Sequence, residues 1–140
     1  IEGPIPEIDL EVESSLHKIC LELISKDMIN SAHDISDGGL AVNIAESLCS
    51  SKENLGADIS IDRKLRADQI LFGESQGVII VSLDPKNLHE IAILAQKYDI
   101  YTQTLGTVTD TGILKINDLV DLGRDDISEA YFESLANIME

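Results

Sequence analysis

Residues 31–42 of the chain are SAHDISDGGLAV, and residues 71–81 are LFGESQGVIIV. In the first stretch a polar strand end leads into an Asp-Gly-Gly turn at 37–39, where Asp37 can cap a following helix that runs to about residue 50. In the second stretch a polar segment precedes the continuous apolar run 78–81, which is typical of a central strand covered on both faces. Both stretches therefore combine a regular element with a polar loop.

The rest of the chain supplies further helices and strands around these two stretches. The pattern predicts a helix over 10–28 capped by Asp9, a strand opening at Gly56 with alternating apolar residues, and a helix over 85–97. It then predicts strands over 100–109 and 112–116, joined as a hairpin at 110–111. A last helix is predicted to start with a capping box of Asp126 and Glu129 and to carry the apolar residues Ile127, Tyr131, Leu135 and Ile138. Helices and strands alternate early and strands cluster late. The expected fold class is α+β, a mixed β-sheet packed with helices.

The composition indicates one acidic, globular domain over residues 1–140. The chain has 26 Asp and Glu against 10 Lys and Arg, a net charge of −16, and 44% hydrophobic residues, enough to form a core. The acidity argues against binding to nucleic acid or to anionic membranes. No apolar run approaches the roughly 20 residues of a membrane span. Cys20 and Cys49 lack metal or redox spacing, so we expect free thiols in a reducing, cytoplasmic compartment.

The polar stretch around His33 carries the densest candidate chemistry. A junction of strand and helix exposes backbone N–H groups and the positive end of a helix dipole, which suit an anion. Asp34 and Asp37 offer hard oxygens for Mg²⁺, and His33 can contact a phosphate or a polar substrate group. The alternative is a plain turn, in which Asp37 caps, the glycines turn, and the backbone satisfies His33.

The second polar segment, 73–77, places Glu74, Ser75 and Gln76 between two glycines. Three adjacent polar side chains can make several directed hydrogen bonds, although an ordinary polar loop has the same composition. The sequence lacks a Gly-Lys-Ser/Thr phosphate loop, a zinc spacing and a nucleophile elbow. Gly106, within a strand pattern, indicates a bulge or close packing.

Together, residues 31–42 and 71–77 resemble phosphoribosylformylglycinamidine synthase, and in particular the last domain of its long synthase subunit. Residues 105–108, LGTV, are similar to the Ile/Leu-Gly-x-Val segment of the wider aminoimidazole ribonucleotide synthase superfamily. The resemblance covers almost the whole chain. It implies the C-terminal domain type of that superfamily, with a partly ferredoxin-like arrangement of the mixed sheet.

The resemblance also implies an activity for the full enzyme, a ligase of purine biosynthesis. That family uses ATP and Mg²⁺ to phosphorylate the amide oxygen of formylglycinamide ribonucleotide, and ammonia derived from glutamine then displaces the phosphate. The implied partners are the remaining domains of the synthase subunit together with the glutaminase and small accessory subunits. The family's catalytic histidine and ATP-binding residues lie mainly in other domains, so the isolated domain is expected to be inactive and to bind no cofactor tightly.

The resemblance implies that this domain forms one wall of a nucleotide or ribonucleotide cleft, or of its pseudo-symmetric counterpart. Asp34 corresponds to a Mg²⁺ ligand. The implied cleft residues are His33, Asp34, Ser36, Asp37, Gly38, Gly39, Glu74, Ser75 and Gln76. Many relatives have an arginine near the position of Val78, and its absence weakens an anion-binding role there. Two alternatives remain open: a non-catalytic scaffold module, and a standalone domain that binds a small molecule or a metal.

Overall fold

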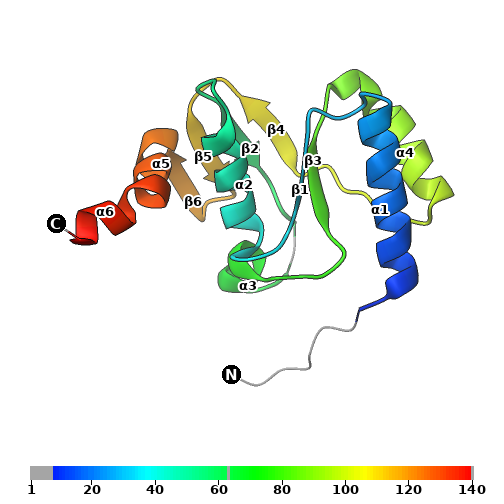
Figure 1. Cartoon of the computed structure of the whole chain (residues 1–140), viewed down its shortest axis with the longest axis horizontal. Helices are drawn as coiled ribbons and strands as arrows, with labels where there is room; N and C mark the ends of the chain where they lie inside the picture. Colours follow the sequence, from blue (N-terminus) through cyan, green and yellow to red (C-terminus); the bar gives the residue numbers. More distant parts are fainter. Residues whose placement is uncertain (1–7, 63, 140) are drawn as a thin grey trace. The chain divides into compact units, whose positions relative to one another are not determined.

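The computed structural model describes residues 8–62 and 64–139 of the chain. Helices and a mixed set of strands alternate along the chain (Figure 1), which confirms the α+β class. The chain divides into two compact units. The first unit runs up to Gly39 and includes residues 74–103, and the second unit combines residues 40–73 with the part of the chain from Thr104 onward.

Helix α1, Leu10–Ser25, opens the first unit. One carboxylate oxygen of Asp9 accepts the backbone N–H groups of Glu11 and Val12, at 2.9 and 3.2 Å, so the predicted N-cap is confirmed. The helix ends three residues earlier than predicted. Asp27 has a left-handed backbone, with φ of 52°, and a residue in that conformation cannot continue a right-handed helix.

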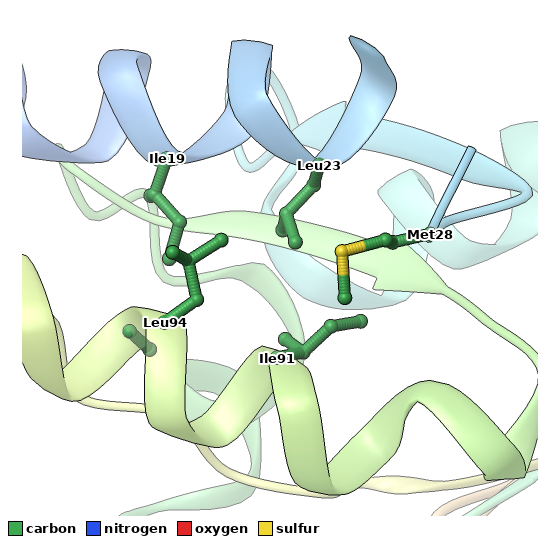
Figure 2. Packing of buried hydrophobic residues seen from close by; sticks show 6 residues of the cluster. Ile19, Leu23, Met28, Ile91 and Leu94 are labelled. Carbon is green, nitrogen blue, oxygen red and sulfur yellow. The ribbon is translucent and has the colours of Figure 1, made fainter. Parts of the chain in front are cut away.

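The core of the first unit lies between α1 and α4, Leu88–Lys97, which are side by side in Figure 1. Figure 2 shows side chains from both helices pointing toward one another with a methionine beside them. The buried cluster consists of Ile19, Leu23, Met28, Ile91, Leu94 and Ala95. A 3₁₀ turn, Pro85–Asn87, precedes α4, and the Asp84 carboxylate accepts the Lys86 N–H at 3.0 Å, which confirms the predicted start.

The first unit also contains a pair of antiparallel strands, β1 (Ser31–Asp34) and β3 (Ile79–Ser82). The prediction of a central strand over 78–81 is therefore wrong in one respect. β3 is half-buried and pairs with β1 alone in a two-stranded sheet of the described residues. A short apolar run favours the extended backbone but carries no information about how many neighbours the strand will have.

The second unit is built on a four-stranded sheet with the order β4-β2-β5-β6. Its strands are β2 (Gly56–Ile59), β4 (Gly106–Thr109), β5 (Ile113–Ile116) and β6 (Val120–Gly123). The predicted hairpin at 110–111 is wrong, because β4 and β5 flank β2 instead of pairing with each other. β2 runs antiparallel to β4 and parallel to β5. The sheet is therefore mixed, as predicted.

The helices of the second unit are α2 (Gly39–Ser50), α3 (Ala67–Phe72), α5 (Arg124–Phe132) and α6 (Ser134–Met139). The alternation predicted for the strand at Gly56 is confirmed, because Ala57, Ile59 and Ile61 are all buried. The predicted capping box is wrong. α5 begins at Arg124, whose backbone N–H bonds the Gly112 carbonyl at 2.8 Å, so Asp126 falls inside the first turn. The side chain of Leu135 lies outside the described residues.

Candidate functional site

The two polar motifs meet because β1 and β3 are antiparallel. Asp34, the last residue of β1, is paired with Ile79, the first residue of β3. The chain therefore leaves β1 and enters β3 at the same end of the strand pair. One more backbone hydrogen bond extends the ladder beyond the strands, from the Ile35 N–H to the Val78 carbonyl at 2.9 Å. The loops 35–39 and 73–78 consequently lie next to each other, although Gly38 of the first loop and Glu74 of the second are 36 positions apart.

The loop after β1 closes in a turn with two left-handed glycines. Gly38 and Gly39 have φ angles of 86° and 71°, which side chains with a Cβ rarely adopt. The Gly39 N–H donates to the Ser36 carbonyl at 3.2 Å, and the Gly38 N–H donates to a carboxylate oxygen of Glu74 at 2.9 Å. The second of these bonds joins the two motifs directly.

His33 and Asp34 stand at the end of β1. The His33 side chain is half-buried, and its Nδ1 lies 2.9 Å from the Asp34 backbone carbonyl. A carbonyl oxygen can only accept, so this contact assigns the proton of a neutral ring to Nδ1 and leaves Nε2 as the acceptor. Asp34 is exposed, and its carboxylate belongs to the same end of the strand pair as the turn.

The other predicted site residues also reach this end. Ser36 and Asp37 are exposed in the first loop, and Ser75 and Gln76 are exposed in the second. All nine predicted residues therefore belong to one unit and to one end of its strand pair. The sequence reasoning missed Glu13 of α1. One of its carboxylate oxygens lies 3.0 Å from the position that a Cβ on Gly77 would occupy. Only the packing of α1 beside the loop gives this contact, and no local motif signals it.

The charge of the site is acidic. Residues 31–42 and 71–78 contain three carboxylates and no lysine or arginine. Within the described part of the chain, no group of three or more His, Cys, Asp or Glu side chains is arranged to hold a metal ion. The Asp34 carboxylate is exposed, and a carboxylate oxygen is a kind of ligand that Mg²⁺ accepts. No helix among the described residues is long and apolar enough to cross a membrane.

Comparison with known proteins gives the class. Residues 2–118 match the family model described as "AIR synthase related protein, C-terminal domain". The chain therefore belongs to that family of C-terminal domains.

Individual relatives show a more specific similarity than the family model does. The chain is 37% identical, over 94% of its length, to the phosphoribosylformylglycinamidine synthase subunit PurL of Thermoanaerobacter pseudethanolicus, and it spans 18% of the length of that relative. This finding confirms the resemblance stated from residues 31–42 and 71–77.

Two solved structures of PurL from Thermotoga maritima share the fold. One is complexed with ATP: it is 24% identical with a TM-score of 0.78, and the match covers 91% of this chain and 23% of that one. The other is complexed with FGAR: it is 22% identical with a TM-score of 0.78, and the match covers 89% of this chain and 22% of that one. At these identities the likeness establishes the fold and nothing further.

Proposed function

We propose that this chain is a domain of a phosphoribosylformylglycinamidine synthase and that the end of its β1–β3 pair forms one wall of a nucleotide or ribonucleotide cleft. The observation that carries the proposal is the register of β1 and β3, which gathers the loops 35–39 and 73–78 at one end. Those loops contain the two motifs that resemble the synthase. The relative named as a synthase subunit is similar over almost the whole chain, which supports the same assignment.

In the proposed reaction the amide oxygen of formylglycinamide ribonucleotide attacks the γ-phosphorus of ATP, and ADP leaves. Ammonia then adds at the activated carbon and inorganic phosphate departs, which leaves the amidine. The exposed side chains of Ser36, Ser75 and Gln76 can donate hydrogen bonds to ribose, phosphate or amide oxygens. Binding and orientation are the tasks that this wall performs, because it contains no activated nucleophile.

Because the wall is acidic, a phosphate group needs a cation in order to bind there. Three carboxylates repel a bare polyphosphate, and residues 31–42 and 71–78 contain no lysine or arginine that would offset this repulsion. A Mg²⁺ ion fits this donor set, because it is commonly held by one or two carboxylates plus phosphate oxygens and water. We assign Asp34 as this chain's ligand to Mg²⁺, which when bound would neutralise phosphate charge. The other cationic groups would come from the remaining domains.

The proposal includes the setting of the domain. The chain would occupy the position of the last C-terminal-type domain in a longer cytoplasmic synthase subunit, and a glutaminase and a small accessory subunit would supply and channel ammonia. The T. pseudethanolicus relative is a subunit of a synthase, and this chain spans 18% of its length; both facts support a multidomain, multisubunit enzyme.

A substitution at Asp34 tests the cleft. In the full-length synthase from the same source, we expect Asp34→Asn to lower kcat/KM by about 10- to 100-fold, a loss typical of damaged metal sites, with unchanged thermal unfolding. Asp118→Asn, at an exposed aspartate of the second unit, is the matched control and should leave the kinetics unchanged. Higher Mg²⁺ should partly restore the Asp34 variant.

A second function is a scaffold module, favoured by the Gly38–Glu74 hydrogen bond, which already uses a motif carboxylate inside the chain. In that case Asp34→Asn would leave turnover intact and lower only the stability. A standalone binding domain is the third candidate, and stabilisation of the isolated chain by Mg²⁺ or ATP would support it.

A further inference from the structure

The Glu74 carboxylate of the proposed wall accepts a hydrogen bond from a backbone N–H of the other loop. The last backbone bond between the two loops joins Ile35 to Val78. Farther out, the Gly38 N–H donates to Glu74 Oε1 at 2.9 Å. The two residues are 36 positions apart, so this contact joins loops that have no local reason to stay together.

The turn at Gly38 needs such a contact. Two consecutive glycines with φ of 86° and 71° have a large choice of conformations in a free loop, and glycine loses more entropy on ordering than any other residue. The bond from the Gly39 N–H to the Ser36 carbonyl closes the turn locally. The bond to Glu74 anchors the turn to the second loop. A hydrogen bond to an ionised acceptor is roughly twice as strong as a neutral one.

The position of Gly38 adds a second reason for a carboxylate. Gly38 directly precedes α2, and its N–H is one of the amides at the amino end of a helix that lack a partner within the helix. The first turn of α2 contains no acidic residue. A negative charge near such an end is favourable. Glu74 provides that charge from the other loop and therefore acts on the backbone of the turn.

We propose that Glu74 is a positioning residue of the proposed cleft, which holds the turn 37–39 in its binding conformation and makes no direct contact with substrate or metal. This inference rests on the proposed function. It separates Glu74 from Asp34, whose carboxylate is exposed and is the proposed ligand of Mg²⁺. It also specifies the chemistry that position 74 requires, an acceptor oxygen on a side chain of this length.

Two substitutions at Glu74 test the inference in the full-length synthase. Glu74→Gln keeps an acceptor oxygen at the same reach, whereas Glu74→Ala removes it. We expect Glu74→Ala to raise KM for ATP or for the ribonucleotide by about tenfold and to leave kcat within about threefold of wild type. The reason is that this variant loses a hydrogen bond to a charged group, and that bond orders the binding loop. Glu74→Gln should restore KM to within about threefold of wild type. Glu53→Ala, at an exposed glutamate, is the matched control.

A direct measurement on the turn accompanies the kinetics. Amide hydrogen exchange of the peptide spanning residues 35–41 should be as slow in Glu74→Gln as in the wild type and faster in Glu74→Ala, because the Gly38 N–H loses its acceptor. A purely structural role would lower thermal stability and the fraction of active enzyme and leave KM unchanged.

Three outcomes would overturn the inference: an unchanged KM in Glu74→Ala, unchanged exchange of the 35–41 peptide in that variant, or a loss in Glu74→Gln as large as in Glu74→Ala. The last result would mean that the negative charge of Glu74, and not an acceptor oxygen at that reach, is what position 74 requires. The Asp34→Asn variant separates the two hypotheses. If Asp34→Asn impairs the enzyme and Glu74→Ala does not, only the positioning role of Glu74 is wrong. If Asp34→Asn leaves the kinetics unchanged, the proposed cleft is wrong as well.

Discussion

At the scale of single residues, the Glu22 carboxylate of α1 connects two helices of the first unit. Lys26 Nζ donates to one of its oxygens at 2.7 Å and the Tyr98 hydroxyl donates to the other at 2.8 Å. These bonds, that from Lys26 most of all, favour the ionised carboxylate and hold the pKa of Glu22 below its ordinary value of 4.5. The same contacts raise the pKa of Lys26 and of Tyr98.

This network makes stability depend on pH in a defined direction. Because the pKa of Glu22 is lower in the folded chain, its contribution is complete above pH 4.5 and is lost as the pH falls through the lowered value. The contribution of Lys26 is complete below pH 10.5 and is lost as the pH rises through its raised pKa.

We expect Tyr98→Phe to lower the urea midpoint of unfolding at neutral pH and to differ less from wild type at acid pH. Tyr101→Phe, at an exposed tyrosine, is the control; equal midpoint differences at both pH values would contradict the prediction.

In the second unit, the Arg124 side chain likewise connects two segments that are far apart in the sequence. Its Nε donates to the Leu48 carbonyl at 3.1 Å and its Nη2 to the Ser51 carbonyl at 2.6 Å, so the guanidinium satisfies carbonyl groups at the carboxyl end of α2.

We expect Arg124→Ala to cost about 1.5–3 kcal/mol in the free energy of unfolding, the usual range for hydrogen bonds to a charged group. Arg124→Lys should recover only part of the loss, because an ammonium cannot present the planar fork. Chemical denaturation measures both. Arg66→Ala is the control, because Arg66 pairs with Asp68 on the surface, where such a pair contributes at most about 1 kcal/mol. Equal losses at the two arginines would argue against a capping role.

At the scale of elements, the close approach of β2 and β4 depends on Gly106. It pairs with Ile59, and a Cβ at position 106 would overlap the Asp58 carbonyl oxygen. The interpretation of this glycine as a site of close packing is confirmed. A side chain there must push the two strands apart.

Gly106→Ala should therefore destabilise the second unit by about 1–3 kcal/mol, the usual cost of overpacking. Thr107→Ala, at the next position of β4, should cost less than about 1 kcal/mol because its side chain is exposed. Thermal unfolding of both variants tests this difference. If Gly106→Ala does not change thermal unfolding, β4 can shift away from β2 without a loss of stability.

At the scale of the whole molecule, the chain belongs to a family of C-terminal domains and spans 18% of the T. pseudethanolicus relative. If it is a domain of a synthase, an antibody raised against it should detect, in the source cells, a polypeptide several times heavier than this 140-residue chain. Denaturing electrophoresis of a fresh lysate with protease inhibitors provides the measurement. A band at the mass of the chain alone would favour the standalone binding domain.

Much of the local structure follows from residues that are close in sequence. Asp9 caps α1, the alternation of Ala57 and Ile59 marks the buried face of β2, and Asp84 with Pro85 starts the turn before α4. The site motifs are local as well, because an Asp-Gly-Gly turn and a polar segment between glycines are visible in the chain. Such features depend on backbone preferences and on the periods of a strand or a helix, which a linear pattern records.

The partners of each strand depended on long-range packing. The apolar run 78–81 pairs with a polar strand at 31–34, and β2 lies between β4 and β5, because hydrogen bonding between strands is non-local. The first residue of α5, Arg124, likewise makes its hydrogen bonds to residues far away in the sequence, the carbonyls of Leu48 and Ser51. The contact of Gly38 with Glu74 has the same origin. Sequence patterns identify the two loops of the candidate site, and the antiparallel register of β1 and β3 brings them together.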